Sequence, residues 1–247
     1  MHRIKRAGLA AGATTKELNN VPLDPLDPAV PFAYLLKYTP MNFCDRAIVL
    51  RRRPLQENGR IVTLYTREHG KLEVNFKGVA RAAGKLKALS EPLTVGDYRL
   101  HLRPGSNFPV CTGGTSLRAF PGIRVGAERL FMASHFCELL MSVTPYADPN
   151  PEKYDLLLSA LERLDSRGFT PWTRRAFSLR LAELVGVGFA ETSVGLDHGL
   201  WETLHSGSWD GVDAAPADDD LLRRVDTTIE KCFAGNLGLT FKTAAFV

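Results

Sequence analysis

Five short segments in the first half of the chain have the hydrophobic pattern of β-strands. The clearest is residues 71–77, where Leu72, Val74 and Phe76 alternate with polar residues, so one face is predicted to be buried and the other to meet solvent. The other predicted strands cover residues 46–50, 60–66, 97–103 and 108–117. Short strands in close succession, separated by turns that contain Gly and Pro, favour a small closed barrel.

After Pro121 the apolar residues recur at helical spacing instead. Residues 128–143 are apolar on nearly every side, which predicts a central, buried helix. Asn150 and Thr170 are each followed by a proline, the combination of an N-cap with a first-turn proline, so a helix is predicted to start at each. A last helix is predicted over about residues 220–233.

These patterns divide the chain into three parts and predict an α+β fold. Residues 1–40 are aperiodic and rich in proline, so we expect a disordered extension, with Met41 as a candidate natural start. Residues 41–120 form the predicted five-stranded barrel domain. Residues 121–247 form the predicted helical domain, with an irregular insert at about 189–217 that has room for a short hairpin.

Charge is distributed unevenly between these parts. The 247 residues carry a formal net charge of +4, but residues 41–120 hold 14 Lys and Arg against 6 Asp and Glu, whereas residues 121–247 hold 12 against 18. A cationic module concentrates polyanions at its surface. The alternative left open is an unevenly charged but merely solvated surface, because a single exposed cation is more often hydrated than bound.

The cations of the barrel segment fall at predicted strand ends, on polar strand faces and in the loop over residues 78–90. In a curled sheet these positions can converge on one groove that holds a phosphate backbone. The candidate binding residues are Arg51, Arg52, Arg53, Arg60, Lys71, Lys77, Arg81, Lys85, Lys87, Arg99 and Arg103.

Motifs of several common enzyme classes are absent. The chain has no G-x-x-x-x-G-K-[ST] and no H-E-x-x-H, and near matches to a dinucleotide-binding loop and a nucleophile elbow each fail at a required residue. The four cysteines occur singly, so neither a disulfide framework nor a zinc site is expected. We therefore predict no catalytic residue, metal or cofactor. No apolar run is long enough for a membrane span, and we expect a cytoplasmic protein.

Several blocks of the sequence resemble the RecO family of bacterial DNA repair proteins. They follow the family's order and spacing over roughly residues 43–247, most strongly over 46–93. The blocks are RAIVLRRRPLQE at 46–57, RIVTLYTREHGK at 60–71, FKGVAR at 76–81, LSEPL at 89–93 and LGLTFKTAAFV at 237–247. Many family members also carry a four-cysteine zinc site before the last helix, and residues 189–231 contain no cysteine.

The resemblance implies an OB-fold barrel followed by a helical domain, in a nucleoid-associated protein without catalytic residues. It further implies binding of single- and double-stranded DNA, annealing of complementary strands, contact with the single-strand-binding protein SSB, and loading of RecA together with RecR. On this interpretation the barrel cations hold DNA mainly through its phosphates. Arg174, Arg175 and Arg180 are candidates for pairing with the acidic tail of SSB.

Two other functions stay open when the residues alone are considered. A ribosome-associated RNA-binding protein is the main alternative, because barrels and basic loops do not by themselves distinguish DNA from RNA. A hydrolase that uses an unrecognised His/Asp pair is a more distant one.

Overall fold

A computed structural model describes residues 41–55, 59–79, 86–104, 106, 108–188 and 195–239 of the chain. The extension predicted for residues 1–40, the candidate residues Arg81 and Lys85, and the closing residues 240–247 lie outside these ranges.

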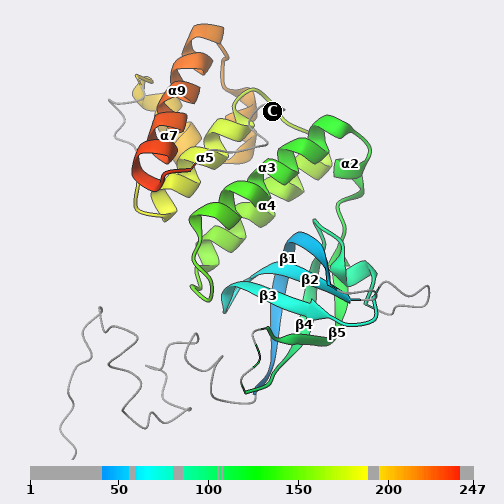
Figure 1. The fold of residues 1–247 in the computed structure, drawn as a ribbon. Coiled ribbons are helices and arrows are strands. Elements are labelled where there is room, and N and C mark those ends of the chain that lie inside the picture. The colour runs from blue at the N-terminus through cyan, green and yellow to red at the C-terminus, as the bar shows by residue number, and fades with distance from the viewer. Residues whose placement is uncertain are drawn as a thin grey trace, which may run out of the picture.

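The predicted five-stranded sheet is confirmed, and it closes on itself (Figure 1). Its strands are β1 (Met41–Leu55), β2 (Gly59–Thr66), β3 (Gly70–Phe76), β4 (Val95–Leu102) and β5 (Val110–Arg118). The hydrogen-bonded order is β1-β2-β3-β5-β4, and β1 also pairs with β4 to complete the ring. The pairing of β3 with β5 is parallel and rests on one residue pair, Asn75 with Val110, so this is the weakest seam of the barrel.

β1 is three times as long as the strand predicted over 46–50, because it serves two neighbours in succession. Residues Met41 to Ile48 pair with β4, and residues Ala47 to Leu55 pair with β2, with a register shift between Val49 and Arg51. A bulge of this kind bends a strand and increases its twist, which lets one strand wrap around a small barrel.

The apolar run in β1 is buried on both faces. Ala47 and Val49 point into the barrel core, whereas Ile48 and Leu50 belong to the core formed with the helices. The two parts of the chain are therefore packed through a shared strand. An ion pair of Arg67 with Asp155, 2.7 Å between Nη1 and Oδ1, adds a second contact between them.

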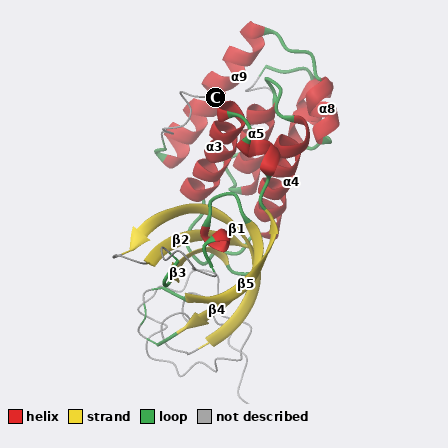
Figure 2. Cartoon of the chain, turned by 90° about the vertical axis from the view of Figure 1, so that its right-hand side faces the viewer, coloured by secondary structure: helices red, strands yellow, loops and turns green. Residues whose placement is uncertain are grey.

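The helical part follows β5 and lies beyond one end of the barrel (Figure 2). Its helices are α2 (Pro121–Arg124), α3 (Ala127–Val143), α4 (Pro151–Arg167), α5 (Thr173–Leu184), α7 (His198–His205), α8 (Trp209–Ala214) and α9 (Asp219–Leu237). The Asn150 side chain caps α4 by accepting from Lys153 N, as its sequence predicts. Thr170 does not cap α5, which starts three residues later. None of the described helices is both long and apolar enough to cross a membrane.

The irregular insert predicted for 189–217 is wrong where the structure describes it, from residue 195 onward. Two short helices occupy this stretch, and Asp197 and Ser208 cap them through their side chains. The apolar residues Trp201, Leu204 and Val212 are buried in a third core cluster. Helices of eight and six residues are too short to display a period, which is why the hydrophobic pattern did not reveal them.

The last helix also extends beyond its predicted end. α9 continues through Gly235 and Asn236 to Leu237, and it stops at Gly238, whose φ of +64° lies in the left-handed region that glycine adopts without strain. Asp218 caps its start by accepting from Leu221 N.

Candidate nucleic-acid interface

The outward side of three neighbouring strands carries two arginines of β1, Arg51 and Arg53. Because directly paired residues of antiparallel strands share a face, the register places Arg51 beside Thr63 and Glu73, and Arg53 beside Ile61 and Asn75. We call Arg51, Arg53, Thr63, Glu73 and Asn75 the outer β1–β3 face. Val62, Leu64 and Val74 alternate with these residues and fill the barrel core.

The outer β1–β3 face has more positive than negative charge. Arg53 Nη2 donates to Glu73 Oε2 at 3.2 Å, and the Arg53 side chain is still 42% exposed. Arg51 is exposed and forms no ion pair with any described residue. The Asn75 Oδ1 atom is buried and has no hydrogen-bond partner among the described residues. One carboxylate thus opposes two arginines on this surface.

Two aromatic rings border this face at the β3–β5 seam. The Phe108 ring lies 6.0 Å from the Arg53 guanidinium carbon, measured to the ring centroid. Tyr146, from the connection between α3 and α4, is 57% exposed, and its ring centroid lies 4.4 Å from Lys71 Nζ. Both distances are within the range of cation–π interactions. Burial and Glu73 raise the pKa of Tyr146, against the opposing effect of Arg51 and Arg53, which places the phenol among these charges.

Lys71 shares the side of β3 that carries Glu73, as the alternation of residues 71–77 predicts, but it does not face solvent. It is only 6% exposed, because Tyr146 and Ala147 run alongside it and Ala147 N donates to Lys71 O at 3.0 Å. Its ammonium group donates to Met141 O at 2.6 Å, and burial lowers its pKa. Lys71 therefore anchors the α3–α4 connection to the barrel and supports Tyr146 from beneath.

Arg52 and Arg60 lie at the end of the barrel near the 3-10 helix η2 (Ala88–Ser90), and not on the outer β1–β3 face. Both pair with the single carboxylate of Glu91, Arg60 at 3.0 Å, and Arg60 also donates to Ser90 Oγ at 2.8 Å. Their positive potential is accordingly reduced.

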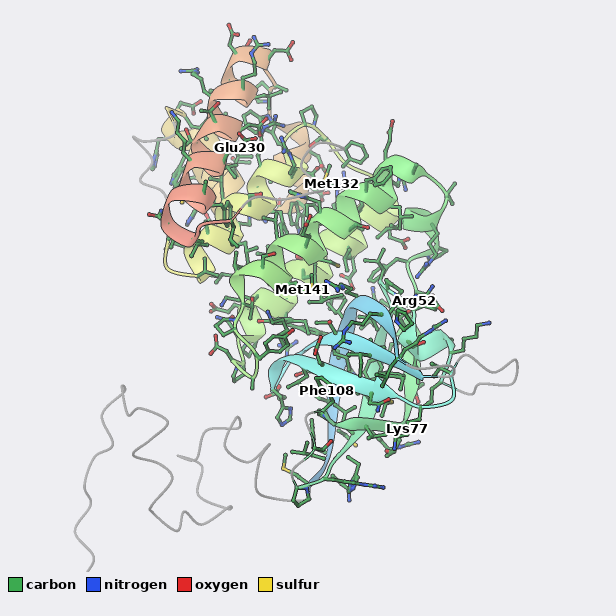
Figure 3. The ribbon with its side chains drawn as sticks, viewed as in Figure 1. Arg52, Lys77, Phe108, Met132, Met141 and Glu230 are labelled. Carbon is green, nitrogen blue, oxygen red and sulfur yellow. The ribbon has the colours of Figure 1, made fainter. Side chains whose placement is uncertain are left out.

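Lys77 and Lys87 are exposed at this same end, directly after β3 and directly before η2. Figure 3 shows Arg52, Lys77 and Phe108 on the barrel, apart from Met132 and Glu230 on the helices. Arg99 and Arg103 belong to a different wall. Arg99 pairs in register with Cys44, about 20 Å along β1 from Arg51 at the rise of an extended strand. Those of the predicted cations that the structure describes thus form separate groups and not one groove.

The three arginines predicted for the acidic tail all have partners inside the helical part. Arg174 and Arg175 share the carboxylate of Asp226 on α9, Arg174 at 2.8 Å. Arg180 donates to the carbonyl oxygens of Leu204, Thr203 and Gly207 at 2.8, 3.2 and 2.7 Å, and its guanidinium carbon lies 4.6 Å from the centroid of the Trp209 ring. Arg180 therefore joins α5 to the segment containing α7 and α8.

The sequence-based search missed Phe108 and Tyr146, because it looked for charge. The signal that could have found them is an aromatic residue in a connection rich in Pro and Gly, where a core role is not expected: Phe108 in the β4–β5 turn and Tyr146 after Pro145. Among the described residues, no group of three or more His, Cys, Asp or Glu side chains is placed to hold a metal ion.

The barrel is closed, has five strands in this order, and carries cations and aromatic rings on its outer face and loops. It belongs to the OB-fold class, in which strands 2–3 and the β1–β2 and β4–β5 loops bind ligands. The particular family follows from the sequence. A family model described as "Recombination protein O N terminal" matches residues 41–120, and a second, described as "Recombination protein O C terminal", matches residues 126–193. Together the two matches cover more than half of the chain, and the chain belongs to the RecO family.

Individual relatives agree with this assignment. The chain is 36% identical over 140 residues to a DNA repair protein RecO of Pelotomaculum thermopropionicum, covering 57% of this chain and 54% of that protein. It is 32% identical over 152 residues to the RecO of Geobacter metallireducens, covering 62% and 59%, and 31% identical over 140 residues to that of Rhodopirellula baltica, covering 57% and 52%. The matches span little more than half the length of these relatives.

Proposed function

We propose that this protein is a DNA-binding recombination mediator of the RecO type. In this role it binds single- and double-stranded DNA on the barrel, anneals complementary strands, and assists RecA loading on SSB-coated DNA together with RecR. It acts by binding and without catalysis, on DNA in the bacterial nucleoid. Membership of a DNA repair family supports the choice of DNA over the RNA-binding alternative.

The observation that carries the proposal is the outer β1–β3 face, where Arg51 and Arg53 project beside Phe108 and Tyr146. Arginine forms bidentate contacts to phosphate oxygens. A protein that anneals strands must leave base edges available for pairing, so binding mainly through the backbone suits the task. Lys77 and Lys87 add further positive charge for the phosphates, as do Arg81 and Lys85, which lie outside the described residues.

A salt titration of binding to single-stranded DNA tests this function. If about four to six cations each neutralise a phosphate, the logarithm of the affinity for single-stranded DNA falls against the logarithm of salt with a slope of about −3 to −4. Sequence preference should be slight. A matched RNA strand in competition, and annealing of complementary strands with and without SSB and RecR, complete the test. A salt-independent interaction, or preference for RNA, would contradict the proposal.

For the proposed contact with the SSB tail we keep Arg174 and Arg175 as candidate residues, because of the cavity beside them. These two arginines line a small cavity between α3, α5 and α9, together with the apolar residues Leu139, Ile229 and Phe233 and the polar residues His135, Ser178, Asp226 and Glu230. Apolar walls beside two guanidinium groups suit an apolar, acidic peptide, which would compete with Asp226 for the arginines. Arg180 does not line this cavity, and we assign it to the fold instead.

The test of this contact is binding of a tail peptide of SSB to Arg174→Gln/Arg175→Gln, with the wild-type chain as reference. We expect a loss of at least tenfold in affinity. Asp226→Asn should strengthen binding, because it removes the carboxylate that competes with the peptide. Unchanged binding in both variants would place the peptide elsewhere.

A further inference from the structure

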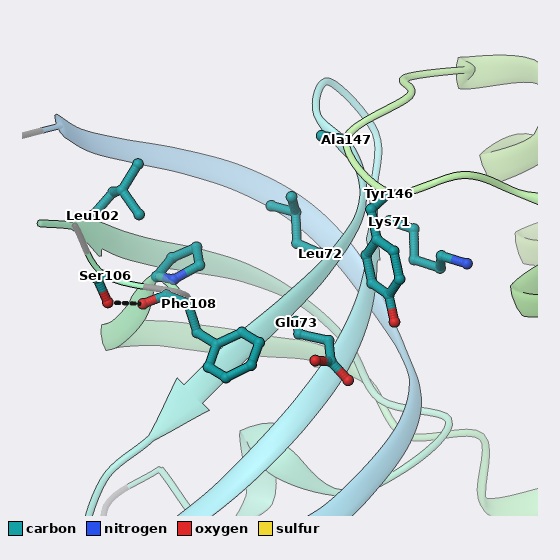
Figure 4. Close-up of a pocket in the computed structure, with 9 residues that line it drawn as sticks. Lys71, Leu72, Glu73, Leu102, Ser106, Phe108, Tyr146 and Ala147 are labelled. Carbon is teal, nitrogen blue, oxygen red and sulfur yellow. Dashed lines mark hydrogen bonds between the residues drawn. The ribbon is translucent and has the colours of Figure 1, made fainter. Parts of the chain in front are cut away.

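A cavity of about 250 Å³ opens at the edge of the outer β1–β3 face. It is lined by Lys71, Leu72, Glu73, Leu102, Ser106, Phe108, Pro109, Tyr146 and Ala147. In Figure 4 the Glu73 carboxylate lies between the rings of Phe108 and Tyr146, and Leu72 lies above Glu73 in this view. Clefts for drug-sized ligands measure roughly 300–1,000 Å³, so this one suits a single planar ring system.

The cavity exists because β3 and β5 pair over only a short stretch at this seam of the barrel. β3 and β5 meet only at Asn75 and Val110, and Asn75 N donates to Pro109 O at 2.8 Å. The rest of the β3 edge is met by the α3–α4 connection, which bridges to Lys71 through Tyr146. The cavity therefore lies between the β4–β5 turn and a segment from the helical part.

The connection is held against the barrel by a close backbone approach. Gly70 has a φ of +70°, and a Cβ atom at this position would lie 2.3 Å from Asp148 O. Only glycine can occupy the turn without displacing the connection. Together with the Lys71 ammonium group, this contact fixes Tyr146 at the rim of the cavity although the residue is more than half exposed.

The chemistry of the walls is that of a stacking site beside a phosphate site. Arg53 lies near the Phe108 ring and Lys71 lies near the Tyr146 ring. Both aromatic residues still line the cavity. Arg51 and Arg53 lie next to the cavity. With Lys71 they make three cations against the one carboxylate of Glu73. Bases of single-stranded nucleic acid stack on aromatic side chains while neighbouring cations follow the backbone.

We propose that this cavity binds one unpaired nucleobase of single-stranded DNA, with Phe108 and Tyr146 as the stacking surfaces and Arg51 and Arg53 on the adjoining phosphates. The inference rests on the proposed DNA-binding function and assigns it a base-recognition site. Double-stranded DNA uses only the cations, because its bases are already stacked. A single base pocket leaves the neighbouring bases available to pair with a second strand.

The experiment compares the full chain with Phe108→Leu, Tyr146→Leu and the double variant. Each is titrated by fluorescence anisotropy with a single-stranded oligonucleotide, an abasic strand of equal length and a duplex. We expect the double variant to bind single-stranded DNA about fivefold more weakly or worse, as loss of one stacked base implies. Binding of the abasic strand and the duplex, and all salt slopes, should be unchanged because no cation is removed.

Two control variants separate stacking from support of the fold. Tyr146→Phe keeps the ring and should restore the affinity that Tyr146→Leu loses. Phe169→Leu removes an exposed ring of the helical part, 38% exposed, and should have no effect. An oligonucleotide containing 2-aminopurine supplies a direct readout, since its fluorescence is quenched on stacking in the wild type and in Tyr146→Phe but not in the double variant.

The outcomes distinguish this inference from the function on which it rests. If the wild type does not bind DNA, the proposed function fails. If the wild type binds with the expected salt slope and the double variant matches it on single strands, the base site alone is overturned. Equal losses on single-stranded, abasic and duplex DNA would also overturn it, since the rings would then only support the cationic face. Loss of SSB-tail binding with normal DNA binding would assign the cavity to a peptide.

Discussion

Two arginines of the barrel and two of the helical part have the same side chain and opposite surroundings. On the barrel, Arg51 is exposed and Arg53 is 42% exposed beside one carboxylate. In the helical part, Arg163 is 10% exposed and paired with Asp213, and Arg180 is enclosed by three backbone carbonyls and Trp209. The first pair remains available to an incoming anion, whereas the second pair already has its acceptors.

The comparison teaches that a count of cations in the sequence overestimates how many of them are available to bind a ligand. A guanidinium group that satisfies carbonyl oxygens contributes to folding, and its removal leaves buried acceptors without donors. One in solvent contributes little to folding, and its field extends to a ligand. Mutations can test whether the two regions differ in this way.

The largest expected effect is on the free energy of unfolding of Arg180→Ala. This change removes the Arg180 donor from the carbonyl oxygens of Leu204 and Gly207, while Thr203 O keeps the bond from Gly207 N, so we expect a loss of about 3 kcal/mol. Arg51→Ala, the matched change on the barrel, should stay within about 0.5 kcal/mol of the wild type. Urea denaturation measures both. Similar values for the two variants would remove the contrast between the regions.

Acid should act on the helical part through His135 of α3. Burial, with a contribution from Arg174, lowers the pKa of His135 to about 4. The unfolded state, with a pKa of about 6.5, takes up the proton first, so stability is lost as the pH falls from about 6.5 to 4. At about 1.4 kcal/mol per pKa unit the loss from this group reaches at most roughly 3 kcal/mol.

Urea denaturation of the wild type and of His135→Gln at pH 7 and pH 4.5 isolates this contribution. The variant should lose less stability between the two pH values than the wild type does, because its side chain takes up no proton. Parallel losses in the two proteins would show that other groups dominate the acid response.

On the barrel the corresponding prediction concerns DNA. Arg51→Ala/Arg53→Ala should flatten the salt dependence of binding to single-stranded DNA by about 1.5 in slope, since each phosphate contact contributes roughly 0.7. The control is Arg223→Ala/Arg224→Ala, which removes two neighbouring exposed arginines from α9 with the same change in charge. It should leave the slope unchanged. Equal flattening in both variants would mean that only net charge matters.

The smallest expected effect is a gain of affinity in Glu73→Gln. Glu73 neutralises part of the Arg53 charge at 3.2 Å, on a surface where such pairs contribute less than about 1 kcal/mol. Its removal should tighten DNA binding by a few fold at low salt, and the gain should shrink as salt screens the arginine. Weaker binding would show that Glu73 orients Arg53 for the phosphate and does not compete with it.

Hydrophobic periodicity determined much of this architecture in advance. The alternation in 71–77 predicted β3, and the change of period after Pro121 predicted the helical part, because side-chain spacing of two or near 3.6 residues is a local property of the chain. The family blocks between 46 and 93 identified the kind of protein for the same reason, since they are contiguous stretches of sequence.

Tertiary structure decided which of the candidate side chains are accessible. The register shift after Val49 places Arg51 and Arg53 on the outer face and turns Arg52 toward Glu91, although the three are adjacent in sequence. Lys71 belongs to a regularly alternating strand, yet a segment some seventy residues later covers it. Burial depends on which distant segment packs against a strand, and no local pattern records that choice. The sequence alone therefore supplied the cations and the rings, and folding placed Phe108 and Tyr146 at one cavity with Arg53 beside Phe108.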